Sequence, residues 1–278
     1  MLICPLCQTG FRQQERTLRC ERNHAFDLAR EGYVNLLPSG GKRPKFLGDS
    51  KEMLRARRAF FDAGFYAPLA SAIEQAAEET LASKTAVSPP SVIDLGCGEG
   101  YYVGQLAQNH PDTCYFGVDI AKEAMRLAAR RHKQVQFVVA DSKRPLPFRP
   151  SAANLLLNIF APRNPQEFSR LLSENGRLLI VIPQKSHLLE LRQAISLLNI
   201  EQDKEAKINV QLAPWFQPLQ QKTVSFELSL SAESAQQLIA MSPSARHLSQ
   251  ADWAKISSID SFQTKAAFRL LQFQKRIL

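Results

Sequence analysis

The segment from Val92 to Gly100 constrains the fold of this chain more than any other stretch, and it reads VIDLGCGEG. A short apolar run leads directly into a turn with glycine at every second position, and a helical pattern follows. Glycine tolerates positive φ angles and lets the backbone approach a ligand closely. The first turn of the following helix leaves its N–H groups free. The segment therefore predicts a strand, a ligand-binding turn and a helix, in that order.

Short apolar strands alternate with helices from Ser91 onward. We expect strands at Val92–Leu95, Tyr115–Val118, Val135–Val139, Asn154–Ile159, Arg177–Ile182, Thr223–Leu230 and Ala266–Gln274, and helices at Tyr101–Gln108, Lys122–Arg131, Pro165–Leu172, His187–Leu198 and Ala232–Met241. Two further helices, Glu52–Ala63 and Tyr66–Ala82, precede them, the first capped by Asp49 or Ser50. Such alternation predicts an α/β fold with a seven-stranded, mostly parallel sheet covered on both faces.

The glycine spacing indicates which cofactor the turn binds. In Gly96-x-Gly98-x-Gly100 the third glycine comes one residue earlier than in the dinucleotide pattern G-x-G-x-x-G. With Asp94 at the end of the strand, this spacing resembles the first motif of class I S-adenosylmethionine-dependent methyltransferases, which have a Rossmann-like fold. The methionine part of that cofactor carries an ammonium group, and an acidic side chain at this turn suits it.

The next two strands also end in acidic residues. Asp119 follows the glycine turn at the spacing, about 20 residues, at which an acid can accept hydrogen bonds from both ribose hydroxyls. Asp141 follows the third strand, where methyltransferases of this fold often hold the adenine amino group. A single such aspartate can be a chance surface residue, but three at consecutive strand ends favour a cofactor site.

A separate pattern near the N-terminus predicts a metal site. Cys4, Cys7, Cys20 and His24 form the pattern C-x2-C-x12-C-x3-H. Two thiolates two residues apart can bind one ion in a tight turn, and a second pair then completes a tetrahedron. Three cysteines and one histidine form a closed, structural ligand set for zinc. Residues 1–36 are too few to build a core unaided, so we expect the metal to stabilise their fold.

Composition narrows the compartment and the partner. The chain has 278 residues and a formal net charge of +9, which attracts polyanions such as nucleic acid. No apolar run approaches the roughly 18 residues needed to cross a bilayer, and the N-terminus lacks the pattern of a secretory signal. We therefore expect a cytoplasmic protein without disulfides, with Cys97 and Cys114 as packed thiols. Breakers and positive charges between Pro38 and Ser50 predict a basic loop.

Two absences bear on the methyl acceptor. Methylation of pyrimidine C5 requires a cysteine nucleophile, and no Pro-Cys pair follows the fourth strand. Exocyclic amino methyltransferases of DNA usually carry Asn/Asp-Pro-Pro-aromatic there, whereas this chain has Asn158-Ile159-Phe160-Ala161-Pro162. By elimination, a ring nitrogen of a base is the remaining methyl acceptor. Sequence alone assigns no catalytic base.

Several motifs together resemble one family, the RlmA-type 23S rRNA (guanine-N1)-methyltransferases. The resemblance runs from about residue 3 to 195 and rests on the motifs Cys4-Pro5-Leu6-Cys7, Glu31–Pro38, Gly48-Asp49-Ser50, Ala56–Phe60, Asp62-Ala63-Gly64 and Gly96–Tyr102. The Glu31–Pro38 stretch is specific, because ordinary methyltransferase domains lack it. The resemblance implies a target guanine in a hairpin loop of domain II of 23S rRNA. Of the two guanines that such enzymes modify there, we expect guanine 745 rather than guanine 748.

The same resemblance implies roles for individual residues. It places Tyr66, Gly98, Glu99 and His187 against the cofactor, and it implies a homodimer whose two chains form one RNA cleft. From the residues alone, the pattern favours Tyr66 as a half-buried core aromatic and His187 as a helix cap over a contact with the cofactor. Arg57 and Arg58 either form a solvated face, grip phosphate or brace the cofactor helix. We expect a zinc module at 1–36 for RNA recognition, a basic loop and linker helices at 37–90, and the methyltransferase domain at 91–278.

Three other functions remain open at this level. The chain can be a methyltransferase acting on a small molecule or a protein, although the zinc module and positive charge argue against that. It can be a non-catalytic zinc-containing RNA-binding protein that retains an inactive cofactor fold, which the intact series of strand-end acids disfavours. A dehydrogenase is the third alternative, and the early third glycine argues against it.

Overall fold

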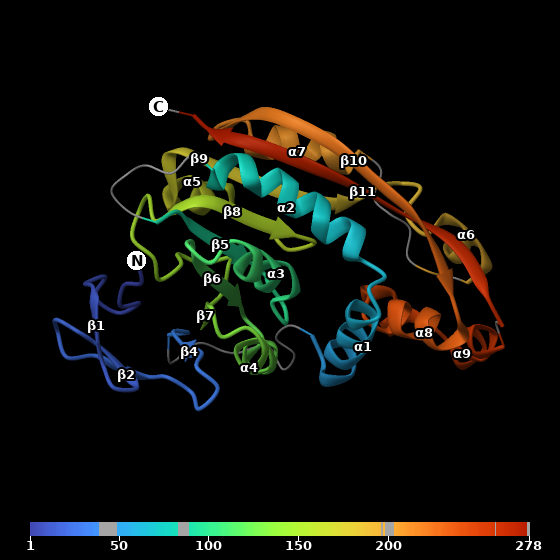
Figure 1. Ribbon diagram of the computed structural model, residues 1–278, viewed down its shortest axis with the longest axis horizontal. Helices are drawn as coiled ribbons and strands as arrows, with labels where there is room; N and C mark the ends of the chain where they lie inside the picture. The colour runs from blue at the N-terminus through green and yellow to red at the C-terminus, as the bar shows by residue number, and fades with distance from the viewer. Residues whose placement is uncertain (39–48, 83–88, 196, 198–202, 259, 277–278) are drawn as a thin grey trace.

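The computed structural model describes residues 1–38, 49–82, 89–195, 197, 203–258 and 260–276. Its centre is an eight-stranded sheet in the order β10-β11-β9-β8-β5-β6-β7-β4 (Figure 1). The strands are β4 (Val34–Asn35), β5 (Ser91–Leu95), β6 (Cys114–Asp119), β7 (Val135–Val139), β8 (Ala153–Ile159), β9 (Leu172–Pro183), β10 (Phe216–Leu230) and β11 (Phe262–Lys275). Neighbours from β4 to β9 pair in parallel, whereas β11 pairs antiparallel with both β9 and β10. The α/β fold with a mostly parallel sheet is confirmed.

The parallel strands are apolar on both faces because helices cover both. All five residues of β5 are buried, and neighbours such as Val92 and Ile93 pack into two different apolar clusters. One face is covered by α2 (Ala67–Leu81), α3 (Tyr101–Asn109) and α4 (Lys122–Arg131), the other by α5 (Pro165–Leu171) and α7 (Lys204–Leu212). The hydrophobic run in each central strand is therefore a consequence of burial on two sides.

The seven predicted strands all form, and the structure adds to them. The eighth, β4, has two residues and pairs with β7 through Val34 and Val138. Strand β9 begins at Leu172 and β10 at Phe216, earlier than their apolar patterns indicate. Helix α6 (Leu189–Ala194) is shorter than expected, although 196 and 198–202 lie outside the described residues. Helices α7 and α9 (Gln250–Ser257) were not predicted.

The N-terminal residues form a small sheet of their own. Strands β1 (Phe11–Gln14), β2 (Thr17–Cys20) and β3 (Ala25–Asp27) pair antiparallel. The first residues then contact the segment before β8, since Ile3 N–H donates to the Pro147 carbonyl at 2.9 Å. Together with β4, this contact attaches the N-terminal sheet to the main sheet. The proposed boundary at residue 36 lies just after β4.

Helix α1 (Lys51–Asp62) stands apart from the sheet and packs against α8 (Ala232–Ala240), which follows β10 (Figure 1). Of the two predicted caps, Asp49 and Ser50, the structure uses Ser50, whose Oγ accepts from the Met53 N–H at 3.2 Å. Most of the predicted basic loop, residues 39–48, lies outside the described part of the chain.

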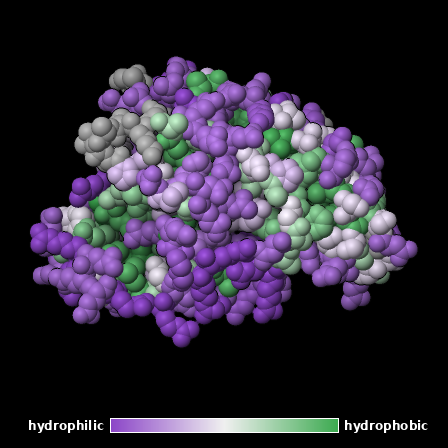
Figure 2. All heavy atoms as spheres, viewed as in Figure 1, coloured by the Kyte–Doolittle hydropathy of each residue, from purple (hydrophilic) through white to green (hydrophobic). Residues whose placement is uncertain are grey.

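The surface is seen in Figure 2 from the same side as in Figure 1. Hydrophilic side chains cover much of the face in this view, and hydrophobic ones gather towards the projecting ends of β10 and β11. Among the described helices, none has the length and apolar character needed to cross a bilayer.

Helices α3 and α4 pack so closely that a side chain at Gly104 would clash with the His132 ring. Only 4% of His132 is exposed, and its ring nitrogens have no hydrogen-bond partner. Burial, aided by Arg131 and Arg58, lowers the pKa of His132 to about 4. The imidazole is therefore neutral at physiological pH.

His132 makes stability depend on pH. As the pH falls below the ordinary histidine pKa of about 6.5, the unfolded chain binds a proton that the folded chain rejects until about pH 4. We therefore expect His132 to lower the free energy of unfolding by about 3 kcal/mol as the pH drops from 6.5 to 4. Above pH 6.5 it should make no difference. Urea unfolding of His132→Leu should show a flatter pH profile. Parallel profiles for the variant and the unaltered protein would contradict this assignment.

Candidate cofactor and metal sites

A cavity of about 1090 Å³ opens at the carboxyl ends of the parallel strands. Eight of the nine predicted cofactor residues line it: Tyr66, Asp94, Gly96, Gly98, Glu99, Asp119, Asp141 and His187. Gly100 does not line it. Its φ is +79°, and a side chain there would clash with the Phe137 ring, so Gly100 serves the turn and its packing. Segments far apart in sequence therefore meet at one site.

The glycine turn is held by backbone hydrogen bonds and by Asp119. The N–H groups of Gly96 and Cys97 donate to the Val118 carbonyl at 2.8 and 3.0 Å. The Gly98 N–H donates to Asp119 Oδ2 at 3.0 Å. Gly96 has a φ of +81° and faces Ala161 so closely that a Cβ would clash with it. Glycine is required here both by conformation and by space.

Three carboxylates of the site are withdrawn from water. Burial, and then the neighbouring Asp119, raises the pKa of Asp94 to about 8, and Asp94 Oδ1 has no hydrogen-bond partner. Burial also raises the pKa of Asp119, although its oxygens accept from the N–H groups of Gly98 and Ala121. Glu99 is 3% exposed, and both of its oxygens lack hydrogen bonds. Buried acids without donors are unfavourable by themselves, so they fit a ligand that brings an ammonium group and hydroxyls.

Arginines of α1 brace this turn. Arg57 pairs through Nη1 with Asp49 and donates through Nη2 to the Met241 carbonyl at 3.2 Å. The same Nη1 lies 3.1 Å from where a Gly98 Cβ would stand. Arg58 Nε lies 3.9 Å from Glu99 Oε2, and its charge offsets part of the rise in the pKa of Glu99 that burial causes. Of the three roles considered for this pair, bracing the cofactor loop is the one that these contacts support.

Tyr66 and His187 form part of the wall from the opposite side. Tyr66 is buried in an aromatic cluster, edge-on to Phe60 and Phe268 at ring distances of 5.1 and 5.2 Å, and burial raises its pKa. It is at once a core aromatic and a cavity residue. His187 Nδ1 accepts from the Ala267 N–H at 3.1 Å, and burial lowers the pKa of His187 to about 3. The neutral ring therefore carries its proton on Nε2, which can donate but adds no charge.

Asp141 stands at the outer part of the cavity. Its Oδ1 accepts from the Lys143 N–H at 3.0 Å, and its Oδ2 lies 3.6 Å from Arg144 Nε. Asp49, Arg57 and Phe160 are among the cavity residues that were not predicted as site residues. All three lie in segments noted for other reasons, but no pattern in one sequence indicates that α1 folds against the glycine turn.

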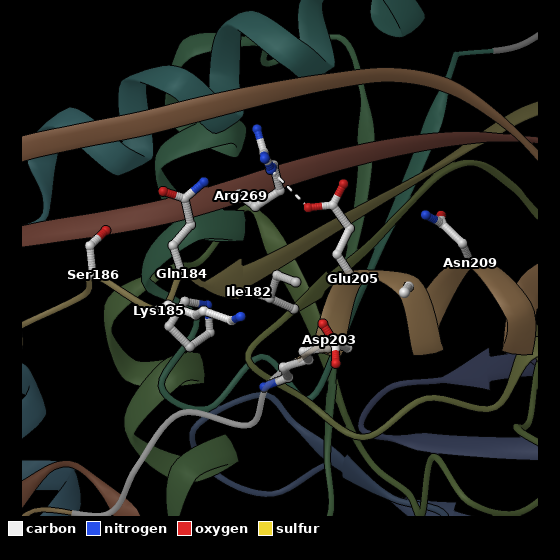
Figure 3. A pocket seen from close by; sticks show the side chains of 11 residues that line it. Ile182, Gln184, Lys185, Ser186, Asp203, Glu205, Asn209 and Arg269 are labelled. Carbon is white, nitrogen blue, oxygen red and sulfur yellow. Dashed lines mark hydrogen bonds and ion pairs between the residues drawn. The ribbon is translucent and has the colours of Figure 1, made fainter.

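A second hollow of about 580 Å³ lies at the carboxyl end of β9 (Figure 3). It shares Pro183 and Lys204 with the first cavity. Arg269 and Glu205 face each other in it, joined by an ion pair of 2.9 Å. None of the predicted site residues lines it, and its arginine is already neutralised.

The four predicted metal ligands come together in the N-terminal sheet. Their ligand atoms lie within 4.8 Å of one another. Cys4 Sγ and Cys20 Sγ lie 3.5 and 3.4 Å from His24 Nδ1, and the sulfurs of Cys7 and Cys20 are 3.6 Å apart. A tetrahedral zinc ion with ordinary bond lengths requires about 3.6 Å between sulfur and nitrogen and about 3.8 Å between sulfurs. The cluster therefore fits a structural zinc ion.

The two remaining cysteines differ from each other. Cys97 packs against the apolar cluster beneath the glycine turn, as the sequence predicts. The prediction was wrong for Cys114, which is exposed at the first position of β6. A strand that alternates between two covered faces still leaves its ends open to solvent.

Comparisons with known proteins agree with both sites. A family described as "RlmA, N-terminal", a zinc ribbon, matches residues 2–45, and one described as "Methyltransferase domain" matches residues 92–180. A 23S rRNA (guanine(748)-N(1))-methyltransferase of Streptomyces fradiae is 41% identical over 88% of this chain and 86% of its own. A Micromonospora griseorubida protein, named provisionally as a 23S rRNA (guanine-N(1)-)-methyltransferase, is 34% identical over 98% and 97%. A Bacillus subtilis protein with a similarly provisional name is 35% identical over 69% and 68%.

Replacing a metal ligand should separate the two sites. Cys7→Ser should lose the zinc ion, whose binding contributes on the order of 10–16 kcal/mol in small zinc modules. RNA affinity should fall more than S-adenosylhomocysteine affinity, because no metal ligand lines the cavity. Metal analysis, an RNA gel shift and titration calorimetry measure these quantities. The exposed Cys114→Ser is the matched control, and full zinc content in Cys7→Ser would exclude Cys7 as a ligand.

Asp119→Ala should abolish cofactor binding while the sheet stays folded. The variant loses the acceptor for the ribose hydroxyls and the bond that holds the Gly98 N–H, so we expect a loss of S-adenosylhomocysteine affinity of about 100-fold or more. Titration calorimetry measures the affinity, and circular dichroism checks the fold. Asp260→Ala, at an exposed position, is the control. Unchanged affinity would remove Asp119 from the site.

Proposed function

Since the chain belongs to the family of 23S rRNA (guanine-N1)-methyltransferases, we propose that it transfers a methyl group from S-adenosylmethionine to N1 of a guanine in a hairpin loop of domain II of 23S rRNA. The observation that carries the proposal is the meeting of the glycine turn and three strand-end acids in one cavity. The identity to relatives over nearly the whole chain supplies the substrate class.

In this proposal, different side chains contact different parts of the cofactor. Asp119 accepts from the ribose hydroxyls, and its fixed position follows from its bonds to the Gly98 and Ala121 N–H groups. Asp94 takes the ammonium group, which relieves an oxygen that otherwise has no partner. Asp141 faces the adenine, and Tyr66 and His187 close the wall near β11. When bound, S-adenosylmethionine supplies an electrophilic methyl group already attached to a positive sulfur.

The protein then has to bring guanine N1 into line with that methyl group. Such alignment by itself contributes several kcal/mol to lowering the barrier. N1 lies on the base-pairing edge, so the target guanine must be unpaired and extruded into the cavity, which a hairpin loop makes easier. N1 also carries a proton at neutral pH, and a base must accept it.

The zinc ribbon and the basic surface bind the RNA in this proposal. A closed metal site with four protein ligands has a structural role, so the ribbon contributes shape rather than chemistry. The net charge of +9 provides attraction to phosphates that weakens with added salt. We also propose that two chains form one RNA cleft and that the protein acts in the cytoplasm, where rRNA is assembled into ribosomes.

Two positions compete for the methyl group. The expectation from sequence is guanine 745, whereas the Streptomyces fradiae relative is named for guanine 748. Both lie in the same hairpin loop, so the zinc ribbon and the cavity serve either one without change. Mapping of the modified base separates them.

Deleting the gene should remove one N1-methylguanine from domain II of 23S rRNA. Because the methyl group blocks the pairing edge, reverse transcriptase stops one nucleotide before the modified base in RNA from the parent strain only. Purified protein should restore the stop on deletion-strain rRNA when S-adenosylmethionine is added, and Asp119→Ala protein should not. A stop that persists in the deletion strain would refute the proposal. Methyl transfer to a metabolite extract in place of RNA would point to a small-molecule enzyme.

A further inference from the structure

Phe160 is the one exposed aromatic side chain among the described residues. Its exposed fraction is 45%, whereas the other described Phe, Tyr and Trp side chains are buried or half-buried. It directly follows the last residue of β8 and lines the cofactor cavity. An exposed phenyl ring gains nothing from the hydrophobic effect while it stays in water. Its position at the mouth of a functional cavity therefore calls for a ligand.

The backbone at Phe160 is held in an unfavourable conformation. Its φ is +55°, a left-handed value that is a genuine outlier for a bulky residue. The Phe160 N–H donates to the Val181 carbonyl at 3.2 Å, and Asn158 Nδ2 donates to the Pro162 carbonyl at 2.9 Å across the turn. Asn158 itself is fully buried. The surrounding bonds thus impose the conformation, as is common where strain serves a site.

The turn is also locked to the cofactor loop. Ala161 packs so closely against Gly96 that no side chain fits between them. The residue next to Phe160 therefore contacts the backbone that binds the cofactor. The position of the Phe160 ring relative to the cofactor is set by backbone contacts rather than by a flexible side chain.

The Phe160 ring has support on one side. Its ring centre lies 5.4 Å from that of Phe268 on β11 at a tilt of 45°, and Phe268 in turn contacts His187 and Tyr66. This chain of rings continues the cavity wall from the cofactor residues out to the surface. With nearly half of its area uncovered, the Phe160 ring offers a flat apolar face at the cavity.

We propose that Phe160 is the platform on which the extruded target guanine stacks, so that the base lies flat against the ring with its N1 edge free to face the methyl group. The inference rests on the proposed function and deepens it. Stacking holds the plane of a base but leaves its edges open, which an in-line attack by N1 requires. Base–aromatic stacking is worth enough that removing the ring should lower the rate about 5- to 150-fold.

Other roles for Phe160 fit the observations less well. A core aromatic is covered, as Phe168 is at 0% exposure. A protein-docking surface gathers several apolar side chains, whereas the other exposed large hydrophobics of the described residues belong to other segments: Met1, Leu6, Leu189, Val210 and Leu219.

Four substitutions test the stacking role in the full-length protein with S-adenosylmethionine and a hairpin RNA from domain II. Phe160→Ala and Phe160→Leu should lower kcat/KM for the RNA by about 5- to 150-fold, because neither offers a flat face. Phe160→Tyr should restore nearly the full rate. Phe160→Gly should lose the rate while its melting temperature stays equal or rises, because glycine accepts the positive φ without strain. S-adenosylhomocysteine affinity should be unchanged in all four.

Leu219→Ala is the matched control, since Leu219 on β10 is also 45% exposed and lies outside the cavity. A normal rate in Phe160→Ala would overturn the stacking role. So would a loss of S-adenosylhomocysteine affinity that parallels the loss of rate, which would assign Phe160 to the cofactor wall, and so would a Phe160→Leu rate equal to that of Phe160→Tyr. If the unaltered protein transfers no methyl group to the RNA, the proposed function fails first and takes this inference with it.

Discussion

Asp119 joins two strand ends through one carboxylate, and the geometry of the site follows from that bond pair. One oxygen accepts from the Gly98 N–H in the turn after β5, and the other accepts from the Ala121 N–H in the turn after β6. The glycine turn can keep its positive φ angles only while it stays against the end of β6, where Val118 also accepts two of its N–H groups. The buried Glu99 lies in the same turn, and the buried Asp94 lies in β5 just before it. A single ionisable side chain thus anchors both turns at the edge of the cavity.

Much of this arrangement could be predicted from the sequence because it is local. Strands buried on two sides are continuous apolar runs, and glycines and acids at strand ends stand at fixed spacings from them. The metal site could be predicted for the same reason, because the spacing of its cysteines and histidine is visible in the sequence. What escaped prediction depends on distant contacts: β4 is a strand only because Val34 pairs with β7, and α7 has a mixed polar surface with only Ile208 and Leu212 buried.

The site shows the same division between local and distant causes. Asp94, Asp119 and Asp141 follow from strand ends, so their meeting in one cavity was foreseeable once the sheet was parallel. Arg57 reaches the glycine turn from α1, which packs against α8, and it donates to the Met241 carbonyl 184 residues later in the chain. Phe160 is marked by its backbone angle and exposure, neither of which a single sequence displays. The predicted cofactor residues are therefore recognisable from local sequence patterns, whereas the surface presented to the methyl acceptor depends on contacts that form only in the complete fold.

The short strand β4 has a consequence for the whole molecule. It lies immediately downstream of the zinc ribbon and pairs with Val138 and Val139 at the outer edge of β7, whose sequence VQFVV is apolar and rich in β-branched residues. Uncovered edges of this kind recruit strands from other chains. Because β4 follows the metal ligands directly in the chain, the stability of the ribbon also bears on how well that part of the edge stays paired.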